Sequence, residues 1–309
     1  MTKNAFIFPG QGSQTIGMLA DIAQNHPKIL DTFNEVSDKM GYDLWELIQE
    51  DPESKLNLTE YTQVAMLTSD VAIFRLLQKA GKTEAAFMAG HSLGEYAALV
   101  CSSAISLVDA AKLVAKRGQL MQESVPAGQG AMAAIVGLTD AQVEDLCKEA
   151  SSSNEQVTPA NFNAIGQVVV AGHTPAVHRV VAAAEKASAR LAAIIPVSVP
   201  CHCGLLTKAA ESFSEFLSKV DFKVPKIPVI SNVDLSTYQS PEQIRALLSK
   251  QLYMPVRWVE TIQLLKRNQV EKIIECGPGK VLSGLVKRID NSLTTVSICN
   301  EASLRGYLE

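Results

Sequence analysis

The chain has no long apolar run, no excess of positive charge and no closely spaced pair of cysteine clusters in its 309 residues. Its first apolar run is broken at once by Pro9 and Gly10, so neither a signal peptide nor a membrane span is expected there. A formal net charge of -4 at pH 7 provides no basic stripe for a phosphate backbone. We therefore expect a cytoplasmic protein that binds neither nucleic acid nor membranes.

The six cysteines are scattered and include no C-x-x-C pair, so a disulfide framework is not indicated. The segment PCHC at 200–203 offers three soft metal ligands, but no second cluster completes a four-ligand site. Internal repeats and low-complexity tracts are also lacking. We expect reduced thiols and no metal site.

Short apolar runs that alternate with helical patterns are what the sequence does contain. The runs are bounded by Pro, Gly or Asn, as buried parallel strands are, and lie at 4–8, 85–90, 227–231, 270–275 and 294–298. A helix over 241–252 is predicted to begin with Ser240 as N-cap and Pro241 at the first helical position. The predicted fold class is α/β, with a parallel sheet in the main body.

Residues 130–199 follow a different order, which reads β-α-β-β-α-β. Strands are predicted at 130–138, 157–164, 167–172 and 190–199, and helices at 139–150 and 173–187. The second helix is expected to have Thr174 as its cap and Pro175 at its first position. This order is the ferredoxin-like signature. We predict a small domain over 129–198, inserted into a large domain formed by 1–128 and 199–309.

The segment AGHSLGEY sets Ser92 between two glycines, directly after an apolar run and directly before a helical pattern. A strand that ends in Gly-x-Ser-x-Gly and runs into a helix forms a nucleophile elbow, whose strained backbone tolerates little bulk nearby. Gly90 and Gly94 leave that room, and the Leu93 N–H is expected to serve as an oxyanion donor. The alternative, a chance match in a helix-capping loop, is disfavoured by the strand-turn-helix context.

A serine hydroxyl needs a base to become a good nucleophile, and the chain has five histidines. Three of them lie in a polar loop, a turn and an amphipathic helix, where structural roles are expected: His26, His173 and His178. His91 adjoins Ser92, but adjacent side chains at a strand end point to opposite sides, which favours a role in the wall of the site. His202, in the turn PCHCG, is the predicted general base.

A third group normally orients such an imidazole. Asp234 and Glu275 are unconvincing candidates, because neither lies at an obvious sheet-edge turn. A backbone carbonyl is the alternative.

Arg117 falls on the apolar face of the helix predicted from SLVDAAKLVAKRGQLMQ. An unpaired buried guanidinium is costly, so it must form an internal ion pair, reach solvent, or grip a substrate carboxylate with both arms of its fork. The N-terminal loop FPGQGSQ is not a phosphate loop, because Thr15 replaces the third glycine and no G-K-[ST] follows. We expect it instead to lend the N–H of Gln11 as a second oxyanion donor.

Six motifs, in this order, resemble the malonyl-CoA:acyl carrier protein transacylase family of bacterial fatty-acid synthesis. They are GQGSQ, GHSLGEYAAL, KRGQLMQ, NFNAIGQVVVAG, VSVPCHC and QLYMPVRW, and the match spans nearly the whole chain. The resemblance implies an α/β-hydrolase-like large domain that holds a ferredoxin-like small one. It agrees with the pattern derived above from the apolar runs.

The resemblance also implies a role for each matching residue. Ser92 matches the nucleophile, His202 the base, and the main-chain carbonyl of Gln251 the group that orients this base. The remaining matches are the malonyl-binding arginine, the two oxyanion-hole amides and two pocket positions: Arg117; Gln11 and Leu93; Asn161 and Gln167. His91, from its place beside Ser92, is the further residue expected to bind substrate. One departure is Cys201, where the family commonly has serine, which puts the polarity of the pocket in doubt.

The implied activity moves a malonyl group from malonyl-CoA to the phosphopantetheine thiol of acyl carrier protein, through a malonyl-serine, in ping-pong order. It implies no metal or redox cofactor, since coenzyme A is part of the substrate. Malonyl-CoA and acyl carrier protein are the implied partners, with basic residues Arg190, Lys280 and Lys287 as candidates to dock the carrier, and a monomer is expected. A serine thioesterase or esterase shares the elbow and the histidine, and is the first alternative. A non-catalytic acyl-binding module is the second.

Overall fold

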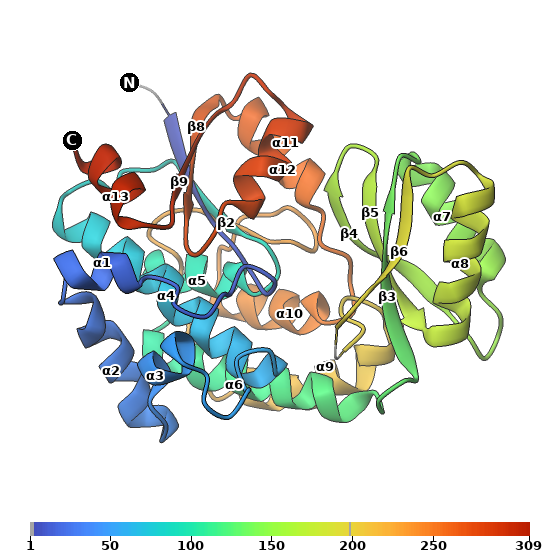
Figure 1. Ribbon diagram of the computed structural model, residues 1–309, viewed down its shortest axis with the longest axis horizontal. Helices are drawn as coiled ribbons and strands as arrows, with labels where there is room; N and C mark the ends of the chain where they lie inside the picture. The colour runs from blue at the N-terminus through green and yellow to red at the C-terminus, as the bar shows by residue number, and fades with distance from the viewer. Residues whose placement is uncertain (1–2, 198) are drawn as a thin grey trace.

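The computed structural model describes residues 3–197 and 199–309, which fold around two separate β-sheets (Figure 1). The larger sheet has five parallel strands in the order β7-β2-β1-β8-β9. They are β1 (Lys3–Phe8), β2 (Phe87–Gly90), β7 (Val229–Ile230), β8 (Val270–Cys276) and β9 (Thr294–Ile298). Each coincides with one of the five predicted apolar runs, so the predicted α/β class with a parallel sheet is confirmed.

Helices cover both faces of this sheet, because its strands bury side chains on both sides. Phe6 and Phe8 of β1 point to one face and pack on Phe74, while Ala5 and Ile7 point to the other. On the first face lie α1 (Ala20–Asn25), α2 (Ile29–Met40), α3 (Leu44–Gln49), α4 (Thr59–Lys79), α5 (Gly94–Cys101), α6 (Leu107–Ser124), α9 (Thr207–Leu217), α10 (Pro241–Gln251) and α13 (Glu301–Leu308). The second face is covered by α11 (Trp258–Arg267) and α12 (Val281–Ile289).

The helix predicted over 241–252 is present as α10. The Ser240 hydroxyl accepts a hydrogen bond from the Gln243 N–H, and Pro241 occupies the first turn. Both start signals therefore act as predicted.

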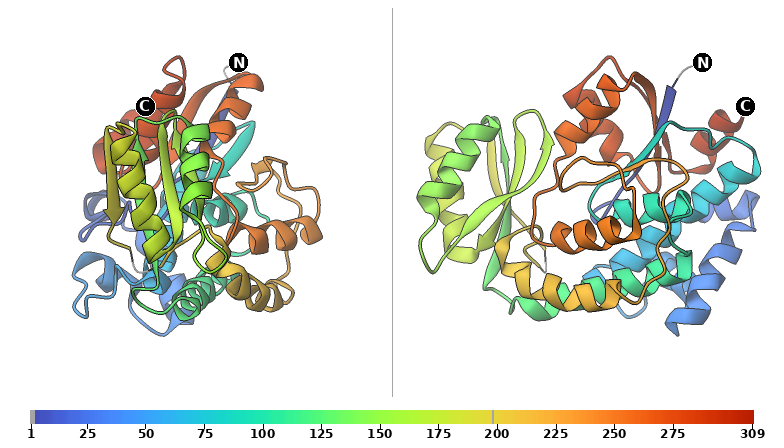
Figure 2. Two further views of the ribbon diagram at one scale, coloured as in Figure 1. Left: turned by 90° about the vertical axis from the view of Figure 1, so that its right-hand side faces the viewer. Right: turned by 180° about the vertical axis from the view of Figure 1, so that it is seen from behind.

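The smaller sheet is antiparallel, with strand order β4-β5-β3-β6. Its strands are β3 (Gly130–Val136), β4 (Val157–Ala164), β5 (Gln167–His173) and β6 (Leu191–Ile195). Two helices, α7 (Asp140–Ala150) and α8 (Thr174–Lys186), pack on one face, and Figure 2 shows them on the outer side, away from the large sheet. The chain order and the strand order are those of a ferredoxin-like fold, so this part of the predicted class is confirmed.

Two details of the small-domain prediction are wrong. Thr174 does not cap α8: the helix already includes it, and its hydroxyl donates to the carbonyl of Gly128 at 2.8 Å. The strand predicted over 190–199 ends at Ile195, because Pro196 has no N–H to continue the ladder. Ser198 lies outside the described residues, and the boundaries of the two domains remain a prediction.

None of the helices within the described ranges combines the length and the apolarity that crossing a membrane requires.

The turn from β2 into α5 is the sharp elbow that the glycine spacing predicts. Ser92 has a φ of 52°, in the left-handed backbone region that residues other than glycine rarely adopt. A Cβ built on Gly90 would lie 1.9 Å from the backbone carbon of Gly94, and one on Gly94 would lie 2.0 Å from the Phe8 oxygen. Only glycine fits at these positions because backbone, not a flexible side chain, fills the space.

Replacing Gly94 by alanine is expected to lower the free energy of unfolding by about 2–3 kcal/mol, since the new methyl group must displace the β1 backbone. Urea unfolding measures the change. Gly306→Ala in α13 is the matched control, because a Cβ there meets no atom within 4 Å and the helix gains about 0.5–1 kcal/mol. Equal effects of the two substitutions would contradict this account of the elbow.

Candidate active site

The elbow opens into a cavity of about 640 Å³ at the carboxyl ends of the parallel strands. One wall comes from the loop after β1, a second from α6, and a third from the inner face of the small sheet, including Met132, Asn161 and Val169. The rest is lined by Pro196, Val197, Val199, Cys201 and His202, and by Val281, Leu282 and Leu285 of α12. Both sheets therefore contribute to a single site.

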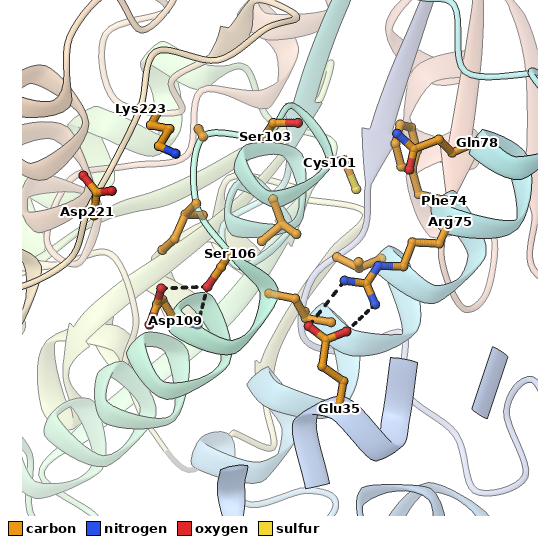
Figure 3. A pocket seen from close by; sticks show the side chains of 15 residues that line it. Glu35, Phe74, Arg75, Gln78, Cys101, Ser103, Ser106, Asp109, Asp221 and Lys223 are labelled. Atoms are coloured by element: carbon orange, nitrogen blue, oxygen red, sulfur yellow. Dashed lines mark hydrogen bonds and ion pairs between the residues drawn. The ribbon is translucent and has the colours of Figure 1, made fainter. Parts of the chain in front are cut away.

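A second cavity, of about 450 Å³, lies between α4 and the start of α6 (Figure 3). Of the charged side chains that line it, Arg75 and Glu35 bond each other at 2.6 Å, and Asp109 accepts from the Ser106 hydroxyl at 2.7 Å. It contains no serine-histidine pair. The chemistry predicted from the sequence belongs to the first cavity.

Ser92 and His202 meet within that first cavity, although they are far apart in the sequence. The Ser92 Oγ lies 2.7 Å from the His202 Nε2. On its other side, the imidazole places Nδ1 2.7 Å from the main-chain oxygen of Gln251, the last residue of α10. A carbonyl can only accept, so Nδ1 carries the proton and Nε2 is free to take one from the serine hydroxyl. The arrangement can perform nucleophilic chemistry.

His202 is 3% exposed and its backbone is held in the left-handed region, at a φ of 59°. Its N–H donates to the Leu252 carbonyl at 3.0 Å, which fixes the turn. Burial and, to a lesser degree, the positive charge of Arg117 lower the pKa of His202 to about 3. The imidazole is therefore neutral at physiological pH, as a proton acceptor must be.

Asp234 and Glu275 do not orient the histidine. Asp234 accepts from the N–H and hydroxyl of Ser236, and Glu275 accepts from the N–H groups of Leu282 and Ser283. The open choice between an acidic side chain and a backbone carbonyl is thus resolved geometrically in favour of the carbonyl.

Arg117 projects from α6 into the same cavity and is 2% exposed. Its NH1 donates to Gln63 Oε1 at 2.8 Å, and its NH2 donates to Gln251 Oε1 at 3.1 Å and to the Ser92 Oγ at 3.3 Å. The guanidinium carbon lies 5.6 Å from the centre of the Tyr96 ring. Among the described residues, its Nε has no partner and no carboxylate forms an ion pair with it. Of the three options for Arg117, the side chain does not reach solvent and forms no ion pair with a carboxylate of the described residues.

Gln11 and Leu93, whose main-chain N–H groups are the predicted oxyanion donors, line the cavity together with Ser92. The loop after β1 packs directly on the elbow: a Cβ built on Gly10 would lie 2.5 Å from the His91 oxygen and 3.7 Å from the Leu93 nitrogen. Within residues 3–197 and 199–309, neither N–H has a hydrogen-bond acceptor. Two unused donors of this kind suit a developing oxyanion.

His91 lies beside the serine but turns away from it. Its Nε2 is 2.8 Å from the Asn163 Oδ1, and its ring meets Trp258 edge to face at 5.4 Å. This agrees with the predicted position in the wall rather than at the base.

The structure separates the two pocket positions predicted on the small domain. Asn161 of β4 lines the cavity and is 7% exposed. Gln167 does not line it: its side chain accepts a hydrogen bond from Arg288 of α12. Gln167 shares a strand face with Val169, which does line the cavity, but lies two residues nearer to the hairpin end.

Three residues that the sequence did not single out support the site. Asn232, just after β7, accepts from the Ser92 N–H at 2.7 Å and donates to the Gly90 carbonyl at 2.8 Å, so it holds both sides of the elbow. Gln63 holds Arg117, and Glu95 holds Gln251. Two signals could have found these residues: Asn232 is a polar residue just after a buried strand, and Glu95 is the one charge in the apolar segment GEYAALVC.

Comparisons with known proteins agree with this geometry. The profile of the acyl transferase domain family matches residues 5–300. The chain is 48% identical over 309 residues to the malonyl CoA-acyl carrier protein transacylase of Escherichia coli (strain K12), with 100% of both chains covered. It is 37% identical to the protein of that name from Staphylococcus aureus (strain MRSA252), covering 100% of this chain and 99% of the other.

Solved structures give the same result. The malonyl CoA-acyl carrier protein transacylase of Coxiella burnetii superposes with a TM-score of 0.97 at 45% identity, over 99% of this chain and 97% of the other. A malonyl-transacylase solved in complex with its type II PKS acyl-carrier protein superposes with a TM-score of 0.97 at 47% identity, over 99% of both chains. The chain therefore belongs to the acyl transferase domain family and, within it, to the malonyl CoA-acyl carrier protein transacylases.

Proposed function

We propose that this protein transfers a malonyl group from malonyl-CoA to the phosphopantetheine thiol of acyl carrier protein, to supply fatty-acid synthesis. The observation that carries the proposal is the meeting of the Ser92–His202 pair and the buried guanidinium of Arg117 in one cavity. A nucleophile and a carboxylate-binding group at this separation suit a substrate with a thioester at one end and a carboxylate at the other.

In the first half-reaction, Ser92 Oγ attacks the thioester carbonyl of malonyl-CoA while His202 Nε2 takes the hydroxyl proton. The N–H groups of Gln11 and Leu93 hold the tetrahedral oxyanion, and each such donor is typically worth ~10²–10³ in rate. The C–S bond then breaks, and the proton on Nε2 passes to the sulfur of coenzyme A. The product is a malonyl ester on Ser92.

In the second half-reaction, the carrier thiol gives its proton to His202 Nε2 and attacks the ester. The same two N–H groups hold the second oxyanion, and the proton returns to Ser92 Oγ as the C–O bond breaks. The same residues thus serve both halves of a ping-pong reaction. Coenzyme A enters and leaves as part of the substrate, so the chemistry needs no metal or redox cofactor.

The Gln251 carbonyl does for His202 what a carboxylate does in a triad: it fixes the tautomer and aims Nε2 at the serine. Being neutral, it stabilises the imidazolium less than a carboxylate would, and the proton passes on readily to the leaving sulfur. The cytoplasmic location and the monomeric state remain predictions, as does docking of the carrier at Arg190, Lys280 and Lys287.

Exposure to malonyl-CoA is expected to add one malonyl group to the intact chain, and Ser92→Ala is expected to abolish the addition because it removes the hydroxyl that bonds His202 Nε2. Intact-mass analysis measures it. Ser102→Ala, whose hydroxyl bonds Leu99 at 3.1 Å outside the cavity, is the control. A label that persists in Ser92→Ala would reject this nucleophile, and a chain that never acquires the group would favour the acyl-binding module.

The fate of the acyl group separates transfer from hydrolysis. With holo acyl carrier protein present, malonyl should appear on the carrier thiol; release of free malonate at the same rate without carrier would favour the thioesterase or esterase instead.

Arg117→Ala is expected to lower kcat/KM for malonyl-CoA about 10- to 100-fold more than for acetyl-CoA, because only malonyl presents a second carboxylate to the guanidinium. Arg117→Lys keeps the positive charge but not the two-pronged guanidinium, so its preference for malonyl-CoA should lie between those of the unsubstituted protein and Arg117→Ala. Acylation rates with the two donors give the comparison, and equal losses for both would contradict a carboxylate clamp.

A further inference from the structure

Glu95 is a buried carboxyl group that the proposed reaction steps do not use. It is the second residue of α5 and 1% exposed. Its Oε2 accepts from Gln251 Nε2 at 2.7 Å and from the Asn232 N–H at 3.2 Å, and its Oε1 bonds the Tyr238 hydroxyl. A carboxylate in this position accepts from three donors, two in the segment between β7 and α10 and one at the end of α10.

One amide connects Glu95 to Arg117. Gln251 directs its Nε2 at Glu95, which leaves its Oε1 facing the NH2 of Arg117 at 3.1 Å. The opposite orientation of the Gln251 amide would place its NH2 group against the Arg117 NH2 group and its oxygen against the Glu95 carboxylate. The Glu95 carboxylate thus fixes the orientation of the Gln251 amide, whose oxygen accepts from Arg117.

The other neighbours of Arg117 carry no charge. Gln63 and Gln251 are amides, Ser92 is a hydroxyl, Tyr96 presents its ring face, and His202 is neutral because its pKa is lowered. Glu95 is the carboxyl group that acts on the guanidinium from behind this layer, and the positive charge of Arg117 in turn favours its ionised form. The substrate carboxylate would approach the same guanidinium from the cavity.

We propose that Glu95 sets how strongly this site prefers malonyl over uncharged acyl groups, by competing with the substrate carboxylate for the positive charge of Arg117. When Glu95 is ionised, its negative charge already compensates the positive charge of Arg117, and malonyl adds a second negative charge. When Glu95 is neutral, the substrate is the counter-ion of Arg117. This inference rests on the proposed function and names Glu95 as a positioning residue that acts through Arg117 and Gln251.

Glu95 changes between its neutral and ionised forms near neutral pH. Burial raises the pKa of Glu95 to about 7, against the opposing effects of the bonds from Tyr238 and Gln251, the Asn232 N–H and the charge of Arg117. The groups that face it are Tyr238 after β7, Gln251 of α10 and Arg117 of α6, and both Tyr238 and the adjacent Tyr96 have a raised pKa and stay neutral. As pH rises through about 7, Glu95 ionises and malonyl binding weakens.

The test compares kcat/KM for acylation by malonyl-CoA and by acetyl-CoA between about pH 6 and pH 8.5, and takes their ratio. Titration of the coenzyme A phosphates or of His202 affects both donors and cancels. The ratio in the unsubstituted protein is expected to fall about ten- to thirtyfold as pH rises, the scale of one charge roughly 8–12 Å away at an effective dielectric near 20.

Glu95→Gln keeps the shape and can keep the bonds, with its oxygen toward Gln251 and its amide toward the Tyr238 oxygen. Its ratio is expected to stay at the low-pH value throughout. Tyr238→Phe removes one donor to the carboxylate, which raises the pKa of Glu95 and shifts the fall in the ratio to higher pH. Glu275→Gln, a change at another fully buried carboxyl group, should leave the profile as it is.

A ratio that does not vary with pH in the unsubstituted protein, or a Glu95→Gln profile that matches it, would overturn the inference. If Glu95→Gln fails to fold, an unshifted profile in Tyr238→Phe overturns it equally. No malonyl-serine at any pH would overturn the proposed function as well, whereas malonyl-serine with a flat ratio overturns this inference alone.

Discussion

The hydrogen bond from His202 Nδ1 to the main-chain oxygen of Gln251, at 2.7 Å, is the contact on which the site depends. It fixes the tautomer that leaves Nε2 free for Ser92. The side chain of the same glutamine bonds the Ser92 carbonyl at 3.0 Å and also bonds Glu95 and Arg117. One residue at the end of α10 thus bonds the His202 imidazole, the Ser92 main chain and the Arg117 guanidinium, and its main-chain carbonyl occupies the position that an acid has in a triad.

Two of the nine non-glycine residues with a positive φ in the described part of the chain lie at the candidate site. Ser92 and His202 both have positive φ values, 52° and 59°, which cost of order 1–3 kcal/mol each for residues with side chains. The surrounding structure compensates: Asn232 bridges the elbow on both sides of Ser92, and the Leu252 carbonyl accepts from the His202 N–H. The hydroxyl and the imidazole are therefore preorganised before any substrate arrives.

Patterns local to one segment carried most of the fold and the centre of the site. Five apolar runs became five strands because a buried parallel strand needs continuous apolar residues, and the glycines around Ser92 revealed the elbow because no other residue fits there. Arg117 stood out because a charge on an apolar helix face is costly. The predictions were wrong where a contact with another segment determines the side-chain position. The Thr174 hydroxyl donates to the Gly128 carbonyl instead of capping α8, and Gln167 accepts from Arg288 instead of lining the cavity.

The supporting layer could not be predicted because its contacts join distant segments. Asn232 reaches Ser92 across 140 residues, and Gln251 reaches Glu95 across 156. The Gln251 carbonyl is a main-chain atom that every residue possesses, so no side-chain pattern marks it, and only the family resemblance pointed to it.

The most direct test of this account is the tautomer of His202, read from the ¹⁵N chemical shifts of its ring in selectively labelled protein. The account predicts a neutral ring with the proton on Nδ1 from about pH 8 down to about pH 5, because burial lowers the pKa of His202 to about 3 and the Gln251 carbonyl accepts that proton. A ring protonated on Nε2, or one that becomes an imidazolium near pH 6.5, would contradict it.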